Sequence, residues 1–139
     1  MGKIILFIAV LGNTLFANVG MVKTLTGTVE VKRGTSTMTL TVGSTLENGD
    51  IIKSKDDSSI GITFSDGSRL ALGAKAIFVI NQFKVEPENK AYDVDLNLKK
   101  GKAIFSSGKV GKLAPESVKF RIPEGIIGIR GTKFAVEVK

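Results

Sequence analysis

The stretch that decides the fold is residues 58–72, which read SSIGITFSDGSRLAL. Apolar residues occupy every second position from Ile60 to Phe64, and this period of two is typical of a half-buried β-strand. A second apolar run follows the pair Asp66-Gly67. Because an Asp-Gly pair adopts positive φ angles at low steric cost, it favours a tight turn between two strands. The stretch therefore predicts a β-hairpin.

The same alternation recurs along most of the chain. It is found at residues 29–31, 38–42, 60–64, 77–85, 92–98, 118–122 and 134–138. In the segment at residues 77–85, the alternation places Ile77, Val79, Phe83 and Val85 on one face of a strand. Turn-forming residues, among them Lys100-Gly101, are predicted to break the strands. No segment of ten or more residues keeps a helical period, so we expect little or no helix. Residues 108–115 carry Lys109 and Lys112 and end in Pro115, so they are predicted to be a surface loop. The pattern predicts an all-β fold, a solenoid-like or rolled stack of short strands.

The composition excludes several classes of chemistry. The 139 residues include no Cys, no His and no Trp. A disulfide, a thiolate nucleophile, an imidazole base and the ordinary zinc and haem ligand sets are therefore excluded, and we expect no cofactor and no metal. Hydrophobic residues make up 42% of the chain, enough for one packed domain. The 20 Lys and Arg residues outnumber the 13 Asp and Glu residues, which gives a net charge of +7.

The N-terminus has the features of a secretory signal. Lys3 precedes an uninterrupted apolar run from Ile4 to Leu11, and Ala17 is the small residue that signal peptidase prefers. The run is shorter than the roughly 20 residues that a membrane-spanning helix needs. We therefore predict a helical signal peptide over residues 1–17 and one β domain over residues 18–139, periplasmic or secreted. An uncleaved inner-membrane anchor is the alternative.

A series of short motifs gives the β domain a recognisable order. The motifs are GTVEVKRG (27–34), VGSTL (42–46), NGDII (48–52), SDGS (65–68), LALG (70–73), LNLKKG (96–101) and GIRGTKF (128–134). Over about residues 22–138 this order resembles the FecR domain, the periplasmic module of ferric-citrate-type transmembrane regulators. The resemblance implies an elongated all-β architecture and a non-catalytic role in contacts with other envelope components. Those regulators carry an anti-sigma segment and a transmembrane helix before the domain. Since only a predicted signal peptide precedes it here, we expect no direct transmission to a sigma factor.

Two predicted turns place a carboxylate beside a glycine. They are Gly49-Asp50 and Asp66-Gly67. Neither has the alternating oxygen ligands of a strong Ca²⁺ loop, so we interpret each aspartate as bonding its own turn or pairing with a basic residue. Arg130, beside Gly131 in the GIRGTKF motif, is the candidate partner. Its guanidinium is predicted to form a bidentate pair with Asp50 or Asp66 and so to pin distant turns together.

Asp93 and Asp95 lie two residues apart on an alternating segment, so both project from one face. Two such carboxylates can act as an acid/base pair, as in glycoside hydrolysis. The chain has no Trp and a single Tyr, and Lys99 and Lys100 are near enough to neutralise the pair. We therefore interpret the two residues as a solvated strand face and expect no enzyme activity.

Basic residues are concentrated in the C-terminal half of the chain. The candidates for a basic face are Lys99, Lys100, Lys102, Lys119, Arg121 and Lys133. Such a face can bind anionic lipid or acidic cell-wall polymer, and the same charge also accounts for solubility. No aromatic residues for base stacking are interleaved with it, so we expect no nucleic-acid partner. Membrane contact is expected only if the signal segment is uncleaved.

The leading hypothesis is an exported, non-catalytic β module that binds a protein partner in the cell envelope and serves as an accessory to an envelope sensing or assembly system. It would bind through an exposed strand edge and a basic face. The alternative is a module that binds cell-wall glycan or another anionic polymer. An enzyme that uses Asp93 and Asp95 is the third hypothesis. The sequence does not identify which strand forms the edge.

Overall fold

The structure is a computed structural model that describes residues 18–129 and 133–139, so the predicted signal peptide lies outside the described residues. The described chain forms twelve strands. They are β1 (Gly20–Thr26), β2 (Val29–Arg33), β3 (Ser36–Thr39), β4 (Thr45–Leu46), β5 (Ile51–Ser54), β6 (Ser59–Phe64), β7 (Arg69–Leu72), β8 (Ile77–Glu86), β9 (Ala91–Ser106), β10 (Val118–Ile122), β11 (Gly125–Ile127) and β12 (Lys133–Val138). The helical segments are η2 (Pro87–Asn89), α2 (Lys109–Leu113) and η3 (Pro115–Ser117).

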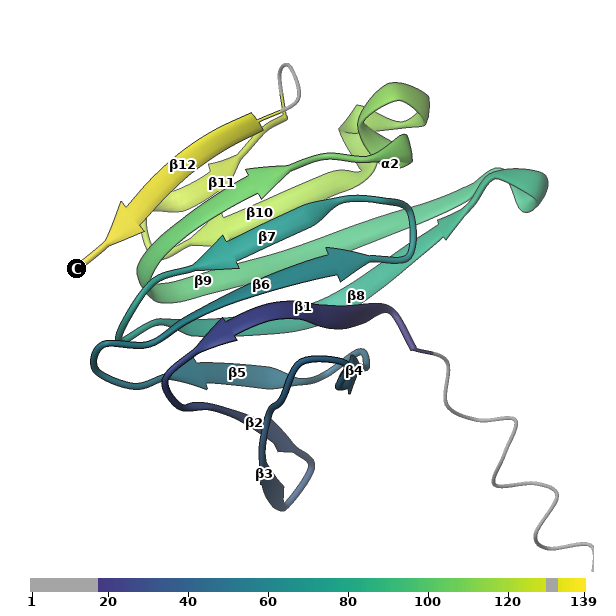
Figure 1. Cartoon of the computed structure of the whole chain (residues 1–139). Coiled ribbons are helices and arrows are strands. Elements are labelled where there is room, and N and C mark those ends of the chain that lie inside the picture. The colour runs from purple at the N-terminus through teal and green to yellow at the C-terminus, as the bar shows by residue number, and fades with distance from the viewer. Residues whose placement is uncertain (1–17, 130–132) are drawn as a thin grey trace, which may run out of the picture.

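The prediction of an all-β fold is confirmed, and the strands form one curled half-barrel (Figure 1). One layer, the β7 layer, has the order β4-β1-β6-β7-β9-β12. The other, the β8 layer, has the order β3-β2-β5-β8-β9-β10-β11. All pairs are antiparallel except β9 with β10. β9 belongs to both layers, so the form is a curled sheet and not a stack of solenoid coils.

Gly101 is the point at which β9 passes from one layer to the other. Residues up to Lys100 pair with β8, and residues from Ala103 onward pair with β7. Gly101 has a φ of 99°, a left-handed conformation that favours glycine. The buried positions change phase there, from even-numbered residues before the bend to Ala103 and Phe105 after it. The prediction of a strand break at this position is therefore wrong, because the glycine bends the strand without ending it.

The hydrophobic core lies between the two layers. Phe64 of β6 stacks on Phe83 of β8, with ring centroids 4.4 Å apart. Phe105, on the β7-layer half of β9, contacts Phe120 of β10 at 5.8 Å. These rings belong to one continuous cluster of buried apolar side chains. Because each layer supplies one apolar face, the alternation in the sequence is the origin of the core.

The predicted phase of β8 is wrong in its first half. The buried side chains there are Phe78 and Ile80, both 0% exposed, in place of Ile77 and Val79. A bulge between Ile80 and Gln82 shifts the register by one residue, so Phe83 returns to the core. The prediction assumed a single alternation from Ile77 to Val85. Because the bulge interrupts this alternation, Ile77 and Val79 were assigned to the wrong face.

The turn over residues 48–50 holds the bulge in place. The Phe83 N–H donates to Asn48 Oδ1 at 2.8 Å, and the Gly49 N–H donates to the Ile80 carbonyl at 2.6 Å. The Ile80 N–H in turn donates to the Asp50 carbonyl at 3.0 Å. The NGD motif therefore satisfies backbone groups that the bulge removes from the strand ladder.

The β6–β7 hairpin is confirmed around Asp66-Gly67. The Gly67 N–H donates to the Phe64 carbonyl at 3.0 Å, and the Phe64 N–H donates to the Ser68 carbonyl at 2.7 Å. Gly67 has a φ of 89°, the positive value that the Asp-Gly pair predicts. The sequence around the turn therefore determines this hairpin locally.

Residues 108–115 are not the predicted surface loop. They contain the short helix α2, and Val110 at its first turn is 0% exposed. Asp66 of the hairpin accepts bonds from two helix N–H groups, the Lys109 N–H at its carbonyl and the Val110 N–H at Oδ2, both at 3.0 Å. A five-residue helix is too short to show a period in the sequence, and its capping residue lies more than forty positions away.

We expect Asp66→Ala to lower the free energy of unfolding by about 2 kcal/mol, because it leaves two buried N–H donors without an acceptor. These are the N–H groups of Ser68 and Val110, bonded to Asp66 at 2.8 and 3.0 Å. Urea denaturation measures the effect, with Asp93→Ala at an exposed position as the control. Equal stability of the two variants would contradict the role of Asp66 as a clamp between hairpin and helix.

Candidate interaction surface

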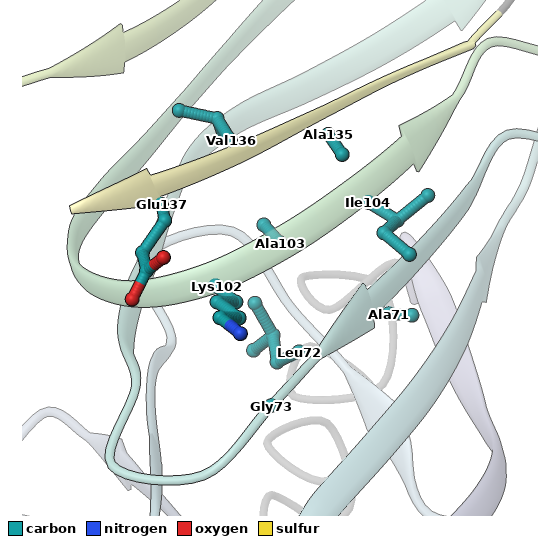
Figure 2. A pocket seen from close by; sticks show the side chains of 9 residues that line it. All are labelled: Ala71, Leu72, Gly73, Lys102, Ala103, Ile104, Ala135, Val136 and Glu137. Atoms are coloured by element: carbon teal, nitrogen blue, oxygen red, sulfur yellow. The ribbon is translucent and has the colours of Figure 1, made fainter.

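A groove of about 500 Å³ lies on β7, β9 and β12 (Figure 2). Its apolar floor is the row Ala71, Ile104 and Ala135, which are directly opposite one another across the three strands. Ile104 is 43% exposed, because the alanines on both sides are too small to cover it. We call these three residues the apolar row. An uncovered isoleucine on a sheet face is a site at which a partner can exclude water.

The ends of the groove carry charge. Lys102 and Glu137 are opposite each other at one end, and Figure 2 shows both there, away from Ala71 and Ile104. Beyond the other end, Arg69 and Lys133 flank Ser106 in the next outward row. Three cations and one carboxylate therefore surround the apolar row, and the net positive charge favours an anionic partner.

β12 borders the groove and is an edge strand. It pairs with β9 through six consecutive rungs without a bulge, and no described strand pairs with its other side. β3 is one of the edges of the β8 layer, because β2 is the one described strand beside it. The two edges lie at opposite ends of the molecule in Figure 1. Open backbone donors and acceptors at such edges can take a further strand.

The alternation at residues 38–42 predicted three inward side chains, and the structure buries one of them. Leu40 is 4% exposed, whereas Met38 and Val42 are 40% and 62% exposed. The reason is that β3 ends at Thr39 and has no neighbour beyond it to extend the core. The edge therefore presents an apolar side chain, Met38, to the surroundings.

Asp50, a predicted turn residue, is fully buried and pairs with Arg33. Arg33 Nε donates to Asp50 Oδ1 at 2.9 Å, and Nη2 donates to Oδ2 at 2.8 Å. The Glu47 N–H also donates to Asp50 Oδ2, and Glu47 Oε2 lies 3.3 Å from Arg33 Nη1. The hydrogen bond to Asp50 raises the pKa of Arg33 above its ordinary value. The predicted bidentate pin thus exists at Asp50 but is formed by Arg33, which the sequence analysis missed.

The residue predicted to form that pin, Arg130, lies outside the described residues, as does Gly131. The other predicted target, Asp66, bonds N–H groups of its own turn and of α2. Gly49 and Gly67 lie in the turns that the sequence assigned to them. The turn residues therefore hold the fold together, and they lie away from the groove.

Asp93 and Asp95 project from one face of β9, but their surroundings differ. Asp93 is exposed, whereas Asp95 accepts two hydrogen bonds from Arg121, at 2.7 and 2.9 Å, and one from Asn81 at 3.2 Å. The Arg121 guanidinium lowers the pKa of the Asp95 carboxyl below its ordinary value, with burial opposing it. A general acid at neutral pH needs a raised pKa, so this environment favours the opposite protonation state.

The lowered pKa of Asp95 predicts a specific pH dependence. A carboxyl with a depressed pKa in the folded state stabilises the protein above its unfolded pKa of about 3.9 and loses that contribution as the pH falls. We expect Asp95→Asn to lower the Tm at pH 7 and to converge with the wild type as the pH falls below about 4. Thermal melts from pH 7 to pH 3 measure this. A constant difference in Tm across the range would contradict it.

The six candidates for a basic face do not form one surface. Lys99, Lys119 and Arg121 are on the strands of the β8 layer, and Lys102 and Lys133 are on the β7 layer beside the groove. Lys100 lies at the bend of β9, next to Gly101. The bend separates residues that are close in sequence, and Arg121 is paired with Asp95.

In the described part of the chain, no three His, Cys, Asp or Glu side chains gather into a possible metal site. None of the described helices is long and apolar enough to span a membrane.

The comparisons with known proteins support the resemblance for the motifs from residue 50 onward. The family described as FecR protein matches residues 50–139, which begin at the buried Asp50 and include the whole groove and the β12 edge. Comparison with curated proteins and with solved structures gives no significant match. Since the family match covers well over half of the sequence, the chain belongs to the FecR family.

Proposed function

We propose that this protein is an exported, non-catalytic FecR module that binds another protein of the cell envelope by adding a strand to an open sheet edge. Family membership supports a role related to envelope signalling. The observation that carries the mechanism is that β3 and β12 are open edges at opposite ends of the molecule. Main-chain hydrogen bonds supply the affinity in this mode of binding, and flanking side chains supply the specificity.

Each edge offers side-chain contacts next to the open backbone. At β3 the exposed Met38 is available to a partner side chain. At β12 the apolar row lies beside the edge and receives an apolar side chain of an added strand, while the nearby cations favour an acidic segment. The pairing of Asp95 with Arg121 supports the non-catalytic part of the proposal.

The test is recovery of partners from the cell envelope. The tagged full chain is crosslinked in its own envelope and recovered, and bound proteins are identified by mass spectrometry. We expect one dominant envelope protein, and the size of the recovered chain reports whether residues 1–17 are removed.

Variants of the two edges make the mechanism falsifiable. Met38→Lys with Ala135→Lys places a charge on each edge strand and is expected to abolish recovery, and the single variants identify the edge used. Ser59→Lys is the matched control, because Ser59 is exposed on β6, a strand that pairs with β1 on one side and with β7 on the other. Undiminished recovery by the double variant, or no partner with the wild type, would overturn the proposal.

A second candidate function is binding of an anionic cell-wall polymer. The observation that favours it is the placement of Arg69, Lys102 and Lys133 around the groove. Sedimentation with isolated cell-wall material is expected to decrease steeply with salt, since exposed charges are screened over ~8 Å at physiological ionic strength. Replacement of the three cations by Gln is expected to remove the binding, and salt-independent sedimentation would exclude this candidate.

A further inference from the structure

We propose that the outer edge of β12 binds a second copy of this chain, so that two β12 strands pair antiparallel about a two-fold axis at Ala135. The proposal rests on strand addition as the mode of binding and names the occupant of one edge. β12 reads KFAVEV, contains no proline and pairs with β9 without a bulge. It therefore lacks the proline and the bulge that commonly prevent an edge from pairing.

The charges of β12 are complementary to those of a second copy. In an antiparallel pair centred on Ala135, Lys133 of each copy lies opposite Glu137 of the other. Directly opposite residues point to the same face, so both charge pairs form on the outer side of the joined sheet. Both side chains are exposed, and neither forms an ion pair with another described residue.

The register follows from these charges. A pair centred on Phe134 places Lys133 opposite Ala135, and a pair centred on Val136 places Glu137 opposite Ala135. Neither alternative matches a cation with an anion. Registers centred between residues turn the core face of one copy towards the outer side of the other, because a shift by one residue reverses the faces. Centring on Ala135 is thus the register that pairs opposite charges and also keeps the core faces of both copies on the same side of the joined sheet.

The inner side of the strand is complementary in the same register. Phe134 of each copy lies opposite Val136 of the other, and both side chains are half-buried in the single chain. Phe134 already contacts Phe105 at 5.8 Å and Phe120 at 5.0 Å. A second copy covers the open side of this aromatic cluster and extends the core across the junction.

The outer side also continues across the axis. The apolar rows of the two copies meet at Ala135, whose small side chain leaves the two-fold axis free of steric conflict. Glu137 then lies between two cations. One is Lys102 of its own chain, which is opposite it on β9, and the other is Lys133 of the second copy. The charges therefore alternate in sign along the joined sheet, and each opposite pair contributes favourably.

The test is a charge exchange measured by analytical ultracentrifugation of the purified full chain. The wild type is expected to form a concentration-dependent dimer. Lys133→Glu or Glu137→Lys alone places two like-charge pairs in the interface, so each is expected to weaken dimerisation at least about tenfold. An equimolar mixture of the two variants restores complementarity and is expected to form a heterodimer, and the double variant K133E/E137K is expected to regain the homodimer.

Lys99→Glu, at an exposed position on β9 before the bend at Gly101, is the matched control and is expected to dimerise like the wild type. Circular dichroism melts confirm that each variant is folded. A wild type that stays monomeric at all concentrations, or single variants that dimerise normally, would overturn the proposal. A mixture that does not associate would do so as well. With β12 paired to a second copy, an envelope protein adds its strand at the β3 edge, so its recovery does not depend on these outcomes and the proposed function is tested separately.

Discussion

Replacing Gly101 with alanine is expected to lower the free energy of unfolding by about 3 kcal/mol or more. A Cβ atom at this position would lie 2.6 Å from the Ala76 Cα and 2.7 Å from its Cβ, so the backbone has to move. The φ of 99° adds about 1–2 kcal/mol of strain for any residue with a side chain. Because β9 belongs to both layers, this movement separates the two halves of the core.

Urea denaturation of Gly101→Ala and of Gly73→Ala measures the effect. Gly73 is the control, because a Cβ there meets only the Lys102 Cβ at an ordinary contact distance of 3.7 Å. The control is expected to change stability by less than about 1 kcal/mol. If the two variants were equally stable, the bend at Gly101 would not depend on the absence of a side chain.

Replacing Arg33 with methionine is expected to lower the free energy of unfolding by about 3 kcal/mol. The substitution removes the counter-charge and two hydrogen bonds from Asp50, whose side chain is 0% exposed. An uncompensated buried charge typically costs 3–5 kcal/mol. The same variant also removes the Arg33 bond to the Thr45 carbonyl at 3.2 Å, which links β2 to β4.

Lys32→Met is the matched control for Arg33, since Lys32 is the exposed neighbour on the same strand. Chemical denaturation at pH 7 is expected to separate the two variants clearly. A double variant, Arg33→Met with Asp50→Leu, is expected to recover part of the loss, because it removes the unpaired carboxylate. No recovery would indicate that packing around Arg33, and not the buried charge, accounts for the loss.

Much of the strand pattern could be predicted from the sequence. The β6–β7 hairpin depends on residues within one short stretch, so local alternation and the Asp-Gly turn identify it completely. The bulge after Ile80 and the bend at Gly101 could not be predicted in the same way. Both depend on contacts with distant segments, the turn at Asn48 and the backbone at Ala76.

The partner of Asp50 shows why charge pairs are difficult to assign from sequence alone. Arg33 is 17 residues from Asp50, and the pairing of β2 with β5 brings the two together. Arg130 lies between two glycines outside the described residues, whereas Arg33 is identified as the partner of Asp50 by the strand register. The same reason applies to Lys99 and Lys102, which are three positions apart in the sequence but lie in different layers because of the bend in β9.

The sequence predicts that some strand of the sheet forms an open edge, but it does not show which strand this is. An edge strand has the same alternation as a central strand, so its position depends on the complete order of the sheet. The self-complementary charges of β12 are visible in its sequence, but they acquire meaning only once the strand is known to be unpaired on one side.

The central claim is that this FecR module binds an envelope protein through strand edges and not through a charged face. The most direct measurement is photo-crosslinking in the envelope from a reactive amino acid placed at Thr37 on the β3 edge, at Ala135 on the β12 edge, or at Lys99 on the exposed face of β9. We predict that an envelope protein is captured from an edge position and not from Lys99. Capture from Lys99 alone would contradict the claim and would assign binding to the face of the sheet.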